Sequence, residues 1–163
     1  MRISARALLQ NLKGEVLLIK FKGAPFGVKD YWATPGGGVE KGESHEETLI
    51  REIHEETGIQ KLELHSCVAT RVFSAGHNKD GSPKFHYERY WYVKALQDSI
   101  SIEGHTDIEK QVVVEVRWWN LDDLKATKDK VYPEFLMEHT DSVLTEKSVA
   151  VPFDFTDLED LKV

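Results

Sequence analysis

Alternating hydrophobic and polar residues predict that strands make up most of this chain. Two apolar runs, residues 3–10 and 15–21, are separated by the turn-forming sequence Asn-Leu-Lys-Gly and predict a hairpin. A Gly- and Pro-containing loop is expected at 22–30. The other predicted strands are residues 31–34, 62–74, 85–95 and 111–119, with a turn at 75–83.

Residues 44–57 predict the best-defined helix of the chain. Ser44 lies three residues before Glu47, which is the signature of a capping box at a helix start. Gly58 follows the last turn and can adopt the left-handed conformation that ends a helix. The apolar residues of this segment fall on an arc about 100° wide, so one face is expected to pack against the rest of the protein.

Fold class follows from the ratio and spacing of these elements. Two further helices are expected at 122–128 and 133–144, so strands outnumber helices. Hairpin-length loops join most neighbouring strands, which predicts an α+β fold with a mixed, largely antiparallel sheet sandwiched between helices. One domain is expected over residues 1–145. An acidic tail, 146–163, is expected to pack on that domain or extend it.

Composition and charge narrow the classes of function. The chain has 163 residues, of which 40% are hydrophobic and 30% charged, as in an ordinary globular domain. A net charge of −7 argues against broad contact with a nucleic-acid backbone, so a phosphorylated ligand would need metal ions. No apolar run is long enough to predict a membrane span or a signal peptide. The only cysteine, Cys67, excludes an intrachain disulfide and fits a reducing cytoplasm.

Three glutamates on the best-defined helix form an unfavourable cluster. Glu52, Glu55 and Glu56 lie at i, i+3 and i+4, where like charges each cost about 0.2–0.5 kcal/mol and oppose the helix dipole near its C-terminus. Such a departure from local stability tends to mark a functional site. Clustered carboxylates are typical ligands of Mg²⁺ or Mn²⁺. The alternative is a solvated acidic face.

The segment around these glutamates resembles a known family. Residues 36–59 read GGGVEKGESHEETLIREIHEETGI, and from Gly37 the pattern G-x5-E-x7-R-E-I-x-E-E-x-G-I resembles the Nudix box of the Nudix hydrolase family at every defined position. The resemblance implies the Nudix fold. It also implies cleavage of a diphosphate linkage in a nucleoside diphosphate joined to another moiety, by water attack assisted by a divalent metal, Mg²⁺ or alternatively Mn²⁺.

The resemblance also implies a role for each matching residue. Glu52, Glu55 and Glu56 correspond to metal-binding carboxylates, and by motif position Glu52 could take the proton of the attacking water. The Gly36 carbonyl corresponds to a backbone metal ligand, and Arg51 to the arginine that orients the glutamates. Glu43 corresponds to a supporting carboxylate. Relatives usually add a downstream carboxylate, for which Glu109 is the first choice, followed by Glu103 and Glu115.

The non-phosphate half of the substrate is less well determined. Phe26 and Tyr90 are candidates to stack on a base, although Tyr90 could instead belong to the core. Residues 73–77 lack the marks of the ADP-ribose and dinucleoside polyphosphate hydrolases. The predicted function is a metal-dependent pyrophosphohydrolase acting on a small nucleotide substrate, of (d)NTP or nucleotide-sugar type, without membrane association. The alternative function left open is a nucleotide-sensing module without catalysis. A homodimer is also left open.

Overall fold

The computed structural model describes residues 1–24, 27–157 and 161. Its sheet has the order β8-β3-β2-β1-β6-β5-β9, with β4 paired to β1 and β7 paired to β2. The strands are β1 (Arg2–Gln10), β2 (Val16–Phe21), β3 (Tyr31–Ala33), β4 (Gly36–Gly38), β5 (Leu62–His77), β6 (Pro83–Ala95), β7 (Val113–Trp119), β8 (Lys130–Tyr132) and β9 (Phe153–Asp154). The helices are α1 (His45–Thr57), α2 (Asp107–Val112), α3 (Leu121–Ala126), α4 (Phe135–Glu138) and α5 (Thr140–Val143).

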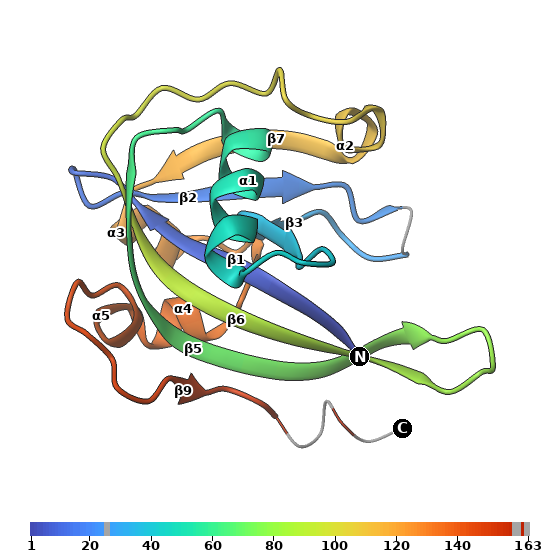
Figure 1. Ribbon diagram of the computed structural model, residues 1–163. Helices are drawn as coiled ribbons and strands as arrows, with labels where there is room; N and C mark the ends of the chain where they lie inside the picture. Colours follow the sequence, from blue (N-terminus) through green and yellow to red (C-terminus); the bar gives the residue numbers. More distant parts are fainter. Residues whose placement is uncertain (25–26, 158–160, 162–163) are drawn as a thin grey trace.

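Strand β1 is the centre of this sheet and has different partners along its length. One edge pairs in parallel with β6, from Arg2↔His86 to Gln10↔Lys94. The other edge meets β2 only at Gln10↔Val16 and pairs with β4 farther back, where Arg6 lies opposite Gly36. The ribbons of β1 and β2 therefore diverge from a common end (Figure 1). This divergence separates β3 from β1 and makes room for a site beside β4.

Both faces of the sheet are covered, because the strands carry two separate sets of buried side chains. Leu49 and Ile53 of α1 pack on one face with Trp91 of β6. Phe135 of α4 and Val143 of α5 pack on the other face. Helix α1 lies across the sheet in Figure 1, with α4 and α5 beyond β6. The expected α+β sandwich is confirmed, and its mixed character comes from the parallel pairings β1–β6, β3–β8 and β5–β9.

Several boundaries differ from the sequence-based predictions. Residues 36–38, which are not among the predicted strands, form β4 because their backbone pairs with β1. The predicted strand 111–119 begins later, because residues 107–112 form α2. The predicted helix 133–144 is divided into α4 and α5 at His139, whose φ of −122° is not helical.

The described part of the tail lies against the sheet. Strand β9 pairs in parallel with β5 at Ala69↔Phe153, and Phe155 stacks on Phe135 with 4.2 Å between ring centroids. The proposed division at residue 145 stays a prediction. Phe26 lies outside the described residues, and its role also stays a prediction. Among the residues that the structure describes, no helix is long and apolar enough to cross a membrane.

Candidate active site

Helix α1 is fixed at both ends by the residues that the sequence indicated. Ser44 Oγ accepts a hydrogen bond from the Glu47 amide at 3.1 Å, and Glu47 Oε2 accepts one from the Ser44 amide at 2.8 Å. Gly58 has φ 73° and donates its N–H to the His54 carbonyl at 2.9 Å. A capping box of this kind stabilises a helix start by about 1 kcal/mol. The helix therefore holds its glutamates in a defined position beside β4.

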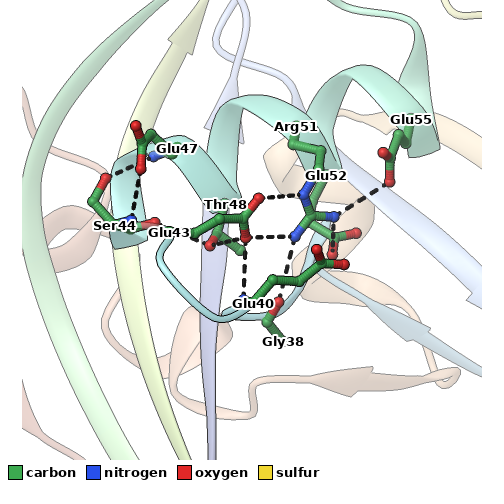
Figure 2. A network of polar contacts seen from close by, with 9 residues as sticks. All are labelled: Gly38, Glu40, Glu43, Ser44, Glu47, Thr48, Arg51, Glu52 and Glu55. Carbon is green, nitrogen blue, oxygen red and sulfur yellow. Dashed lines mark hydrogen bonds and ion pairs between the residues drawn. The ribbon is translucent and has the colours of Figure 1, made fainter.

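Arg51 connects the carboxylates next to β4 (Figure 2). Its guanidinium donates to both oxygens of Glu43, from Nε at 2.7 Å and from Nη2 at 2.9 Å. Nη1 donates to Glu52 Oε1 at 2.8 Å and, more weakly, to Glu55 Oε2 at 3.4 Å. The hydrogen bonds from Arg51 lower the pKa of Glu43 to about 2. Arg51 thus contacts Glu52 and Glu55, two of the three glutamates that it was expected to orient.

Glu56 is the most deeply buried of the box glutamates. It is 8% exposed, and its Oε2 accepts a hydrogen bond from the Gly36 amide at 2.8 Å. Burial raises the pKa of Glu56 to about 8, although the Gly36 amide and the Arg6 charge both act to lower it. Burial also raises the pKa of Glu52 above its ordinary value, against the effect of Arg51. The protein therefore keeps two carboxyl groups where their negative charge is poorly solvated.

A cavity of about 350 Å³ brings together most of the predicted metal ligands, and we call it the carboxylate cavity. Gly36, Glu52, Glu56 and Glu109 all line it. Glu55 does not: its side chain is 46% exposed and lies beside Arg51. The other lining residues are Arg2, Arg6, Phe21, Tyr31, Ala33, Gly37 and Gly38.

Gly37 leaves the space that the Glu52 carboxylate occupies. A Cβ atom at residue 37 would lie 2.3 Å from Glu52 Oε1, which is closer than any real contact. A side chain at residue 37 would therefore displace the Glu52 carboxylate from its present position. This cradle is a structural reason for the first glycine of the box pattern.

Glu109 reaches the carboxylate cavity from a helix that the sequence did not predict. It is the third residue of α2, and its Oε2 accepts from the Thr106 amide at 2.7 Å in a second capping box. Neither Glu103 nor Glu115 lines the carboxylate cavity. Of the three downstream candidates, the structure thus brings only Glu109 to the other carboxylates.

The donor set of this cavity fits a hard divalent cation. It offers carboxylate oxygens and the Gly36 carbonyl, and the burial of Glu52 and Glu56 leaves negative charge that a cation would neutralise. Within the described residues, no three acidic, His or Cys side chains are already grouped closely enough to hold an ion. Arg51 and the Gly36 amide hold Glu52 and Glu56 at present, so these side chains would have to turn toward a metal.

A second polar network was not anticipated from the sequence. Arg6 Nη1 donates to the Gly36 carbonyl at 2.6 Å, and Arg6 Nε donates to Glu88 Oε1 at 3.0 Å. The Tyr90 hydroxyl donates to the other oxygen of Glu88. The signal that could have found it is the alternation in β1, which places the charged Arg2 and Arg6 on one face of a central strand.

Tyr90 belongs mainly to the core. Its side chain is 3% exposed, and its ring meets Phe135 edge-on with 5.0 Å between centroids. It also borders a second cavity, of about 370 Å³, which shares Arg6, Tyr31 and Ala33 with the first. We call this second space the aromatic cavity. Its other lining residues are Thr34, Arg71, Phe73, Ser74, Glu88 and Tyr132.

Comparison with known proteins matches this architecture to a family. The model described as the NUDIX domain matches residues 1–138. The chain belongs to the Nudix hydrolase family. Its box residues are therefore those that form α1, β4 and the connection between them.

Individual Nudix proteins resemble the chain at moderate identity. "Putative nudix hydrolase 1" of Caenorhabditis elegans is 25% identical over 146 residues, which cover 90% of this chain and 36% of that protein. The RNA pyrophosphohydrolase of Shewanella sp. (strain W3-18-1) is 27% identical over 133 residues, with 74% and 76% of the two chains covered. The structure of an ADP-ribose pyrophosphatase from Streptococcus suis aligns with TM-score 0.60 and 16% identity, covering 96% and 98%. The last of these shows the shared fold only.

Proposed function

We propose that this Nudix hydrolase is a divalent-metal-dependent pyrophosphohydrolase that cleaves the diphosphate linkage of a small nucleoside diphosphate derivative. The observation that carries the proposal is the convergence of Gly36, Glu52, Glu56 and Glu109 on one cavity. Oxygen ligands without any sulfur or imidazole favour Mg²⁺ or Mn²⁺. A bound divalent cation would neutralise the diphosphate and acidify the attacking water.

The residues of the chain have separate tasks in this proposal. Glu52, Glu56, Glu109 and the Gly36 carbonyl would hold the cation, together with Glu55, which the box pattern assigns to the same task. Arg51 keeps Glu52 and Glu43 in place through its guanidinium. Glu52 accepts the proton of the attacking water, which is the task that its motif position suggests.

The substrate class is proposed as a (d)NTP or nucleotide-sugar type compound. Two adjoining cavities support it, since one can take the phosphates and the other the attached group. The acidic net charge of −7 favours a small ligand over a long nucleic acid. The proposal includes a cytoplasmic location, which the lone, buried and unpaired Cys67 supports.

A substrate panel tests the proposal. Nucleoside triphosphates, deoxynucleoside triphosphates, nucleotide sugars, ADP-ribose, NADH, dinucleoside polyphosphates and a 5′-triphosphorylated RNA are incubated with the protein and Mg²⁺ or Mn²⁺. Products are separated and identified, with Glu52→Gln as the inactive control and EDTA as the metal-free control. Turnover of none of these compounds would refute the proposal and favour a sensing module.

A further inference from the structure

Arg6 lies at the boundary between the two cavities. Its side chain lines both of them, together with Tyr31 and Ala33 of β3, and is 27% exposed. Arg6 matches no position of the Nudix box, since it lies on β1, far from the box in the sequence. Its position raises the question of what the guanidinium does there.

Two of the three guanidinium nitrogens of Arg6 are already engaged. Nε donates to Glu88, and Nη1 donates to the Gly36 carbonyl. Within the described part of the chain, Nη2 has no acceptor. The Arg6 side chain lines both cavities, so a ligand at their junction would lie beside the guanidinium.

The largely buried Arg6–Glu88 ion pair is expected to add little to the stability of the fold. Glu88 is 8% exposed, and taking two charges out of water usually costs about as much as their attraction returns. The Tyr90 hydroxyl holds the second oxygen of Glu88, which fixes the carboxylate and, through it, the guanidinium. The planar guanidinium is thus presented in one orientation, as oxyanion recognition requires.

The charges around the junction indicate an anion. The carboxylate cavity is lined by Glu52, Glu56 and Glu109, where a cation fits, and by the positive side chains of Arg2 and Arg6. A phosphate needs positive donors, and Arg6 is the one of these two arginines that also lines the aromatic cavity. A phosphate bound at the junction would therefore place the group attached to it in the aromatic cavity.

The aromatic cavity has the size and the walls for a planar group. Tyr31 and Tyr132 meet edge-on with 5.7 Å between ring centroids, and Phe73 lines the same space. Faces of aromatic side chains bind nucleobases with about 1–3 kcal/mol per stacked base. The group attached to the phosphate at Arg6 is thus best matched by a nucleoside.

We infer that Arg6 is a substrate-binding residue, whose Nη2 donates to a non-bridging oxygen of a nucleoside 5′-phosphate while the sugar and base enter the aromatic cavity. This inference rests on the proposed function in placing the rest of the diphosphate in the carboxylate cavity. Glu88 is a positioning residue for the phosphate contact, because it holds the Arg6 guanidinium through Nε.

The test compares nucleosides with their monophosphates. NMR titrations in Mg²⁺ measure the affinity of the intact protein for AMP, GMP, CMP and UMP and for the four parent nucleosides. Arg6→Gln should weaken monophosphate binding by about 10- to 100-fold and leave nucleoside binding unchanged. Arg6→Lys should recover part of the loss, because it keeps the charge but not the planar fork.

Two further variants control for charge and folding. Arg117→Gln makes the same change in net charge on β7, where the guanidinium lies 3.6 Å from the Trp119 ring centroid and borders neither cavity. It should bind monophosphates as the wild type does. The double variant Arg6→Gln, Glu88→Gln removes both buried charges, so no unpaired charge is left inside the protein. It replaces the single variant in the test if Arg6→Gln alone unfolds. Glu88→Gln alone should weaken monophosphate binding less than Arg6→Gln does.

The results separate this inference from the proposed function. Equal losses for nucleosides and monophosphates, or a wild-type protein that binds no monophosphate, would overturn the role of Arg6. Turnover of the diphosphate panel would leave the proposed function intact in either case. Selective loss of monophosphate binding without turnover of any panel compound would refute the proposed function and uphold the phosphate contact.

Discussion

Replacing Glu56 with glutamine should stabilise the metal-free protein, and more strongly as the pH rises. The folded protein buries this carboxyl group, which raises its pKa from 4.5 to about 8. Between these two values the unfolded chain loses the proton while the folded protein keeps it. Unfolding then releases a proton, so the free energy of unfolding falls as the pH rises from about 4.5 to 8.

The size of the effect follows from the two pKa values. At about 1.36 kcal/mol per pKa unit, the wild type should lose roughly 3–5 kcal/mol across this range through Glu56 alone. Glutamine carries no charge and keeps an oxygen that can accept the Gly36 amide hydrogen bond. The variant should therefore match the wild type near pH 4 and exceed its stability by that amount near pH 9.

Urea denaturation in EDTA at a series of pH values measures this difference. Comparing the two proteins at each pH cancels the titration of groups that do not interact with Glu56. Glu55→Gln is the matched control, because it removes the same charge from an exposed side chain of the same helix. A stability difference between wild type and Glu56→Gln that stays constant from pH 4 to pH 9 would refute the reasoning.

Three other changes give distinct expected outcomes. Gly37→Ala should lower kcat about 100-fold with an unchanged thermal melt, because its Cβ would displace the Glu52 carboxylate. Gly38→Ala is the control: its Cβ would meet only the flexible Arg2 side chain, at 3.3 Å, so this variant should keep most activity in the same assay. Arg51→Lys should also lower kcat by roughly 10- to 100-fold at saturating Mg²⁺, since the lysine ammonium lacks the planar fork that binds both oxygens of Glu43 while reaching Glu52; wild-type kcat would contradict an orienting role. Tyr90→Ala should lower the free energy of unfolding by about 3–5 kcal/mol, measured by denaturation, and a stable variant with only a raised KM would instead support base stacking.

Local sequence signals were sufficient where a structure depends on neighbouring residues. The ends of α1 were predicted correctly, because a capping box and a left-handed glycine act within a few residues of the helix end. The strand at residues 36–38 was missed because glycine has low strand propensity, and only the distant β1 makes it a strand. The split of residues 133–144 was missed for a similar reason, since both short helices are formed by packing on the sheet.

The candidate site shows the same distinction. The box residues share one helix and one loop, so their spacing alone indicated that they belong together. Glu109 could be selected only by resemblance, and its arrival at the carboxylate cavity depends on how α2 packs. The contact between Arg6 and Glu88 joins β1 to β6, and no spacing in the sequence indicates it. The sequence also could not decide the role of Tyr90, because the same strand pattern is typical of a core residue and of a residue that contacts a ligand.

The parallel pairing of β1 with β6 has a consequence for how the protein is made. Arg2 pairs with His86, so during synthesis one edge of β1 must wait for a partner that lies more than 80 residues later in the chain. At about 5–20 residues per second, a ribosome needs several seconds to supply it. During that time β1 exposes an unpaired edge, which is the kind of surface that promotes aggregation. A nascent chain that ends soon after the Nudix box therefore has neither a closed sheet nor a complete pocket, and a chaperone would be most useful at that stage.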